Sequence, residues 1–208
     1  MAQTIPATNI SLYDLKTKFG LQRVDDDQFF REWVDDLPQL TNLEKQQLDR
    51  VKASYFNLVE RPMLESTVKM VVLSPLLDMA NFYLSPFSIT AEEEVQISAE
   101  DDGTIVRGRI DVLVIQNQMW ILVIESKRAG FSLEEVIPQA LAYMLANPDA
   151  SKPTFGIVTN GSHFIFIKLS KQDTPQYALS YEFSLRRPGN ELYSVLSILK
   201  QLAQFLGA

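Results

Sequence analysis

The sequence contains no cysteine, so disulfide bonds, thiolate nucleophiles and thiolate zinc sites are excluded. Its single histidine, His163, has no second histidine beside which to bind zinc, and no G-x-S-x-G elbow supports a serine triad. No apolar run approaches the roughly 18 residues that a membrane span needs. The N-terminus lacks the basic segment and apolar core of a signal peptide. We therefore expect a cytoplasmic protein without a membrane partner.

Positive charge is also in short supply. The 19 lysines and arginines are outnumbered by 26 aspartates and glutamates, which gives a net charge of −7. Nucleic-acid binding normally draws on an excess of basic residues, so this balance argues mildly against it. The objection is limited, because a nuclease that gathers metal ions with carboxylates carries negative charge at its site, and the divalent ion reverses the sign there.

The overall composition, with 46% hydrophobic and 22% charged residues, is that of a globular protein. Residues 1–60 are polar and helix-favouring, and they predict an N-terminal helical extension. Within them, Thr41 and Glu44 form a capping box that opens a helix at 42–58. Residues 61–208 are long enough for a domain with a substantial core, and we expect them to form a single compact unit.

A further helix is predicted at 64–83, where apolar residues recur at helical spacing along one stripe. Pro75 lies inside this helix and should kink it or split it in two. Glu65 falls on the apolar stripe rather than on the polar side. Burying a carboxylate costs several kcal/mol unless it is paired or metal-bound, so the position of Glu65 is an anomaly that needs a partner.

The rest of the chain predicts a sheet. Three strands joined by short turns at 100–103 and 116–118 indicate an antiparallel meander, and the nearly continuous apolar stretch WILVIES indicates that the third strand is covered on both faces. We expect the α/β class, with a mixed central β-sheet flanked by helices. The expected strands are 89–98, 104–115, 119–126, 154–159, 164–169 and 177–183, and the expected helices are 133–146 and 191–206.

The residues with chemical potential gather on the second and third strands. Glu125 and Lys127 are two positions apart, so on a strand they project to one face and Ser126 projects to the other. Asp111 lies on the neighbouring strand, and the short hairpin lets it reach the face of Glu125. Two carboxylates and one ammonium group are therefore expected to converge at one end of the sheet.

This grouping suits the hydrolysis of phosphodiester bonds. Mg²⁺ typically takes one or two carboxylates, waters and phosphate oxygens, so Asp111 and Glu125 are candidate ligands, with the backbone carbonyl of Ser126 as a neutral one. The ion polarises the phosphate and acidifies a water. Lys127 is placed to orient or deprotonate that water, or to stabilise charge on the phosphoryl oxygens; the sequence leaves these roles open.

An aspartate followed by Glu-x-Lys is also a short pattern that occurs by chance, and a solvent-facing strand would explain it without catalysis. Glu125 and Lys127, however, continue the apolar run WILVI, which should be buried. Ionised groups at the end of a buried strand need a reason. Burial therefore favours a functional site over chance.

The order of these residues resembles the PD-(D/E)XK nuclease superfamily: Glu65 on a helix, GRIDVLV around Asp111, ILVIESK with Glu125 and Lys127, then PQALAYM. The chain is most similar to the N-terminal nuclease domain of type I restriction enzyme motor (R) subunits, over residues 60–170. The resemblance implies a restriction-endonuclease-like core. It also implies a Mg²⁺-dependent deoxyribonuclease, in which Mn²⁺ can substitute.

The resemblance also implies roles for further residues. Glu65 becomes an additional catalytic and metal-side carboxylate, which would explain its place on the apolar stripe. Gln139 and Tyr143, four apart on one helix face, are implied to contact DNA or to position the site; without the resemblance they would be an ordinary polar–aromatic pair. The first motif departs from the literal pattern, since Ile110 precedes Asp111 in place of proline.

Two groups of charged residues are secondary candidates. Arg109 shares a strand face with Asp111, where it either holds a phosphate or stays solvated or paired with an acid. Residues 92–94 are three glutamates expected at the start of a strand, and the alternative is that one of them reaches a metal. Neither group is assigned by its pattern alone.

Three functions remain open. No phosphate-binding G-x-x-x-x-G-K-[ST] loop is present, so the chain is expected to be a stand-alone nuclease or one component of an assembly. The first hypothesis is a restriction or defence endonuclease acting on DNA, alone, as a homodimer, or with a helicase/translocase or methylation subunit. The second is a catalytically silent nuclease-fold interaction module of a defence or repair complex. The third, an RNA-directed nuclease, is not distinguishable from the first by sequence.

Overall fold

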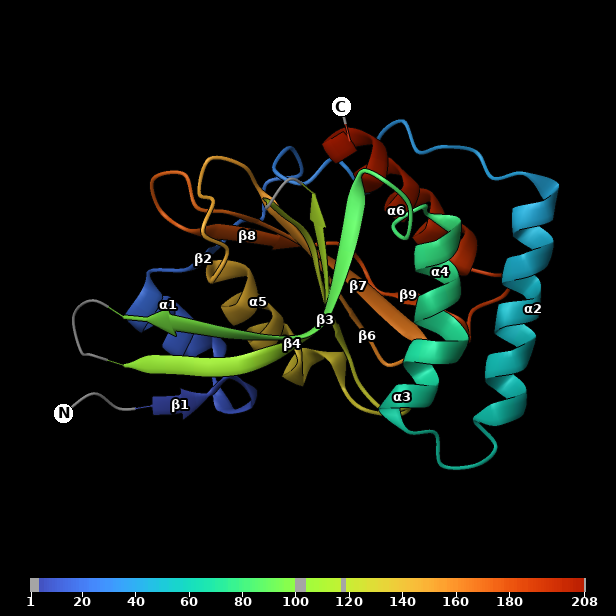
Figure 1. Ribbon diagram of the computed structural model, residues 1–208, viewed down its shortest axis with the longest axis horizontal. Coiled ribbons are helices and arrows are strands. Elements are labelled where there is room, and N and C mark those ends of the chain that lie inside the picture. Colours follow the sequence, from blue (N-terminus) through green and yellow to red (C-terminus); the bar gives the residue numbers. More distant parts are fainter. Residues whose placement is uncertain (1–3, 100–103, 117–118, 208) are drawn as a thin grey trace.

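The computed structural model describes residues 4–99, 104–116 and 119–207. The turn predicted at 100–103, and residues 117–118 of the other predicted turn, lie outside these ranges. Within them, nine strands form one mixed sheet, which helices cover on both faces (Figure 1). The expected α/β class is confirmed.

The strands are β1 (Thr4–Pro6), β2 (Gln22–Arg23), β3 (Phe87–Ser98), β4 (Ile105–Gln116), β5 (Met119–Ser126), β6 (Thr154–Thr159), β7 (His163–Ser170), β8 (Gln176–Leu179) and β9 (Phe183–Ser184). The longest strands are β3 and β4, with 12 residues each. The helices are η1 (Ala7–Asn9), α1 (Leu12–Phe19), α2 (Asn42–Leu58), α3 (Glu65–Val68), η2 (Lys69–Leu73), α4 (Ser74–Met79), η3 (Leu133–Glu135), α5 (Ile137–Leu145) and α6 (Leu192–Gly207). Among these described helices, none has the length and apolar character needed to cross a membrane.

The sheet has the order β1-β4-β5-β6-β7-β8-β2, with β3 added on β4 and β9 on β7. The predicted meander is present, because β3 pairs antiparallel with β4 and β4 pairs antiparallel with β5. On its other side β5 pairs parallel with β6. The strand predicted to be central is thus held by a neighbour on each edge, which gives firm support to a site at its end.

Alternation along β5 divides the interior into two cores. Leu122 and Ile124 pack with α2, α4 and α6 on one face, and Val123 packs with α1 and α5 on the other. Figure 1 shows the same division, with α2, α3, α4 and α6 gathered on one side of the sheet and α1 and α5 on the other. Glu125 follows Val123 by two residues, so the strand directs it toward α5.

The helix predicted at 64–83 is interrupted differently than expected. A π-helical segment, η2, separates α3 from α4, and the Ser74 N–H bonds to the carbonyl of Lys69, five residues back. This segment ends at Leu73, two residues before Pro75, whose ring in a regular α-helix would clash with the carbonyl four residues earlier. Widening the turn is a known way to accommodate such a residue. The helix also ends early, at Met79, because Asn81 takes a left-handed conformation with φ 65°.

The N-terminal segment contains the expected helices and two strands that the sequence did not indicate. Helix α2 has the predicted bounds, and its capping box is formed by Thr41 and Glu44. Strand β1 pairs parallel with β4, and β2 pairs parallel with β8. These strands have three and two residues, too short to show a period-2 pattern. The division of the chain at residue 60 stays a prediction.

Helix α5 approaches the sheet closely at a glycine of β4. A Cβ atom at Gly108 would lie 2.6 Å from the ring and hydroxyl of Tyr143 and 2.7 Å from the Cβ of Ala7. Both distances are shorter than real Cβ contacts. The absence of a side chain at Gly108 therefore allows Tyr143 to lie against β4.

We predict that Gly108→Ala destabilises the protein by about 1–3 kcal/mol, the range for overpacking a filled core. Gly156→Ala is the matched control, because the atom that it meets at 2.7 Å is the flexible thioether sulfur of Met144. Denaturant unfolding of both variants measures the difference. Equal losses of unfolding free energy would contradict the role of Gly108.

Candidate active site

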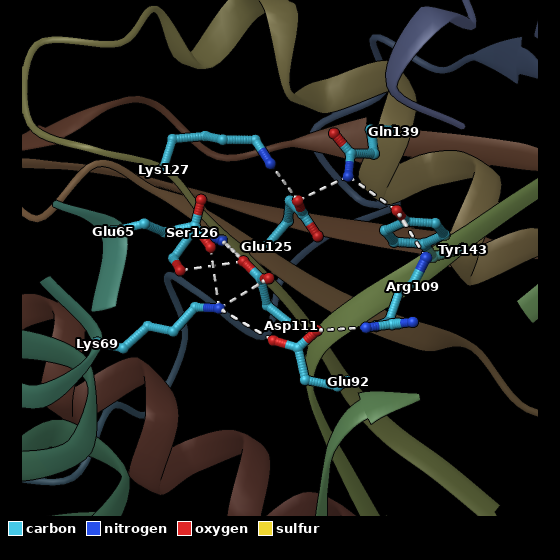
Figure 2. A network of polar contacts seen from close by, with 10 residues as sticks. All are labelled: Glu65, Lys69, Glu92, Arg109, Asp111, Glu125, Ser126, Lys127, Gln139 and Tyr143. Carbon is cyan, nitrogen blue, oxygen red and sulfur yellow. Dashed lines mark hydrogen bonds and ion pairs between the residues drawn. The ribbon is translucent and has the colours of Figure 1, made fainter. Parts of the chain in front are cut away.

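The candidate site lies where the pairing between β4 and β5 ends. The described pairing includes Val112 with Ile124, and Asp111 and Glu125 are the next residues on the two strands. Asp111 Oδ2 accepts the backbone N–H of Ser126 at 2.7 Å and its hydroxyl at 3.0 Å. A carboxylate thus bonds to a backbone N–H just past the β4–β5 pairs, which fixes Asp111 against β5 (Figure 2).

Glu125 is the most deeply buried acid of the site, with 1% of its surface exposed against 8% for Asp111. Its Oε1 accepts hydrogen bonds from Gln139 Nε2 at 2.6 Å and from Lys127 Nζ. Its Oε2 is buried and has no hydrogen-bonding partner among the residues that the structure describes. An unsatisfied carboxylate oxygen in the interior is costly, so this atom needs a proton or a cation.

The electrostatics agree with that requirement. Burial, followed by the nearby Asp111 carboxylate, raises the pKa of Glu125 to about 8, although Lys127 acts in the opposite direction. Two acids buried side by side disfavour each other's ionisation. In the absence of an added cation, Glu125 therefore takes up a proton more readily than an ordinary glutamate does.

The helix predicted to carry Gln139 and Tyr143 brings both to the site. Gln139 Nε2 donates to Tyr143 Oη at 2.8 Å as well as to Glu125, and the backbone N–H of Arg109 donates to Tyr143 Oη at 3.2 Å. Burial, together with the charge of Glu125, raises the pKa of Tyr143 to about 12. The two side chains form a chain of hydrogen bonds from β4 to Glu125 (Figure 2), which positions that carboxyl group.

Lys69 belongs to the site although the sequence analysis did not single it out. Its Nζ lies 2.8 Å from Asp111 Oδ1, 2.9 Å from Glu65 Oε1 and 3.8 Å from Glu92 Oε1. Burial lowers the pKa of Lys69, but its hydrogen bonds to Asp111 and Glu65 outweigh burial and raise it. The signal that was available is the spacing of four between Glu65 and Lys69, which places both on one helix face.

The structure also shows where the secondary candidates lie. Arg109 is paired with Glu92 at 3.5 Å and with Glu94 at 3.2 Å, and its side chain is 55% exposed. The sequence left open whether Arg109 holds a phosphate or stays solvated or paired with an acid. In the structure it is paired with acids. Glu65 reaches the site through Lys69 rather than lying fully buried, since 38% of its side chain is exposed.

The residues present fit a hard divalent cation only in part. No group of three or more acidic or histidine side chains close enough to hold a metal ion occurs among the described residues. Mg²⁺, however, usually takes only one or two carboxylates and completes its shell with waters and phosphate oxygens. Asp111 and Glu125 supply those two, and the partnerless Oε2 of Glu125 is an acceptor of the required kind.

The comparisons with known proteins differ in what they show. A comparison with curated protein sequences gives no match. Among solved structures, one titled "Crystal structure of SSO0001" is 17% identical, with 78% of this chain and 71% of that chain covered and a TM-score of 0.26, and no conclusion rests on it. The family model "Type I restriction enzyme R protein N terminus (HSDR_N)" matches residues 13–174, which include every site residue described above. The chain therefore belongs to the family of type I restriction enzyme R protein N-terminal domains.

Proposed function

We propose that this chain is a Mg²⁺-dependent endonuclease that hydrolyses phosphodiester bonds of DNA, with Mn²⁺ able to substitute. The family is the nuclease region of type I restriction R subunits. The observation that carries the proposal is the buried pair Asp111–Glu125 with Lys127 beside it. Replacing a buried ion pair by apolar residues of similar volume is often neutral or stabilising, so two adjacent buried carboxylates and a lysine favour a functional role over a structural one.

The acids of the site and Lys127 have different parts in this proposal. Asp111, Glu125 and the carbonyl of Ser126 would hold the metal ion, and Glu65 would add a further carboxylate. When bound, the ion supplies Lewis acidity for the phosphate and lowers the pKa of a water. Lys127, held at Glu125, orients that water or stabilises the charge that develops on the phosphoryl oxygens.

The hydrogen-bonded helix residues serve as positioning groups. Gln139 holds one oxygen of Glu125 and so leaves the other directed away for the cation. Tyr143 links Gln139 to the backbone of β4. Arg109 lies at the exposed side of the same strand, where its guanidinium can exchange Glu92 or Glu94 for a phosphate of DNA.

The family places the chain in the context of restriction and modification. We propose that a helicase/translocase or methylation subunit, or a second copy of the chain, is its partner in that context. The competing function is a catalytically silent interaction module. The observation that favours it is the ammonium group of Lys69, which neutralises Asp111 in the absence of a metal.

Removal of Lys127 or Asp111 should abolish cleavage. We predict that Lys127→Ala and Asp111→Ala each lower the rate of plasmid nicking in Mg²⁺ by about 10²-fold or more, the usual contribution of a positioned acid–base group or a metal ligand. The measurement uses supercoiled, linear and single-stranded DNA, and an RNA of the same sequence, with EDTA as the blank. Lys16→Ala, an exposed lysine of α1, is the control and should cleave at the wild-type rate.

Undiminished cleavage by both site variants would reject the assignment of the site. No cleavage of any nucleic acid by the wild type, with the candidate partner subunits added, would favour the silent module. Cleavage of the RNA but of no DNA would support the assignment of the site and show that the substrate is RNA rather than DNA.

The raised pKa of Glu125 predicts a pH-dependent stability. A carboxyl group that holds its proton more tightly in the folded state stabilises the fold at low pH, and this contribution is lost as the pH rises from the ordinary value of 4.5 toward about 8. In EDTA, wild-type protein should lose on the order of 3 kcal/mol relative to Glu125→Gln over this range. Mg²⁺ should restore the wild type and leave the variant unchanged.

Urea unfolding at pH 5, 6, 7 and 8 provides the measurement. Parallel pH profiles for the two proteins would show that Glu125 is ionised to the same extent in the folded and unfolded states.

A further inference from the structure

The ammonium group of Lys69 lies where three carboxylates meet. Asp111 and Glu65 are within 2.9 Å of it and Glu92 is 3.8 Å away, while only 24% of the Lys69 side chain is exposed. The acids come from three separate elements, β4, α3 and β3 (Figure 2). One ammonium group thus pairs with acids from several elements, and Asp111, a proposed metal ligand, is one of them.

The oxygens of Asp111 show why this position matters. A carboxylate offers about four lone-pair sites. Oδ2 already accepts two hydrogen bonds from Ser126, and Oδ1 faces Lys69. A metal ion that uses Asp111 must therefore bind at Oδ1, directly beside an ammonium group. Two cations that share one oxygen repel each other strongly in a partly buried site.

We propose that Lys69 is a built-in cation that competes with the divalent metal for Asp111 and keeps the metal affinity of the free protein low. The proposal rests on the metal-dependent function above. It makes Lys69 a regulatory residue, which neutralises Asp111 until a metal ion displaces its ammonium group.

The surroundings of Lys69 allow this exchange. Glu65, one helical turn earlier, and Glu92, on β3, remain as partners when the ammonium leaves Asp111. Glu92 has φ 60°, an unfavourable conformation for a residue with a side chain. It lies between Ala91 and Glu93, which pair with the two neighbours of Asp111 on β4. That conformation places its carboxylate between Lys69 and Arg109. Displacement therefore moves the ammonium from one carboxylate to another and leaves no charge unpaired.

The test compares Mn²⁺ binding by wild type and Lys69→Met, followed as the loss of the electron paramagnetic resonance signal of free Mn²⁺ at constant ionic strength. Methionine keeps an unbranched side chain, one atom shorter than that of lysine, and removes the charge. We expect the variant to bind Mn²⁺ at least ten times more tightly. Lys69→Gln, which keeps a hydrogen-bond donor for Asp111, gives the same expectation with less disturbance of the fold, and thermal unfolding verifies that each variant is folded.

Arg109→Met is the matched control. It removes one positive charge from the same acidic surface, but its guanidinium pairs with Glu92 and Glu94 rather than with Asp111. Its affinity for Mn²⁺ should change less than threefold. A similar gain for both variants would show that net charge alone governs binding and would overturn the proposal.

The remaining outcomes separate this proposal from the proposed function. Equal or weaker Mn²⁺ binding by both folded Lys69 variants, with binding by the wild type intact, rejects competition by Lys69 and leaves the metal-dependent function standing. No Mn²⁺ binding by the wild type or by either variant rejects both. Binding by the variants alone means that Lys69 excludes the metal completely, which supports the proposal in its strongest form.

Discussion

The burial of two carboxylates beside each other, Asp111 and Glu125, is the constraint on which the rest of the site depends. Like charges in the interior are tolerated only when donors, cations or protons surround them. The neighbours meet this need in different ways: Ser126 supplies a backbone N–H and a hydroxyl, Lys69 and Lys127 supply charge, and Gln139 supplies an amide. One oxygen of Glu125 has no partner among the described residues, and a proton or a divalent cation would satisfy it.

The fold creates the position of Asp111 because the pairing of β4 with β5 ends while the pairing of β4 with β3 continues. Strand β4 continues along β3 past Val112, the point where its described pairing with β5 stops. The backbone groups that follow on β5 then become available to a side chain, and Asp111 uses one of them. Gly108 of β4 also lets Tyr143 of α5 reach the strand, so that α5 can support Glu125. If the β4–β5 pairing continued, the Ser126 N–H would not be available to Asp111. If residue 108 had a side chain, Tyr143 could not lie against β4.

Local patterns were sufficient for much of this structure. The central strand, the capping box of Thr41 and the placement of Asp111, Glu125 and Lys127 follow from periodicity, which depends on near neighbours in the chain. The strands β1 and β2 were missed because tertiary pairing decides them. Pro75 predicts that its helix is interrupted, but not that the interruption takes the form of a π-helical segment. Lys69 was missed for a related reason: its spacing from Glu65 is visible in the sequence, but its contacts with Asp111 and Glu92 join segments that only the fold brings together.

The excess of acidic residues in the chain does not by itself exclude DNA binding at the site. Lys69, Lys127 and Arg109 are each paired with a carboxylate, so a phosphate group that approaches must compete with an internal ion pair. A divalent ion bound by Asp111 and Glu125 would take over these carboxylates and release positive charge toward the nucleic acid. Metal and DNA then favour each other's binding, because each relieves a repulsion that the other would meet alone. A negative net charge is thus compatible with a nuclease whose attraction for DNA depends on its metal.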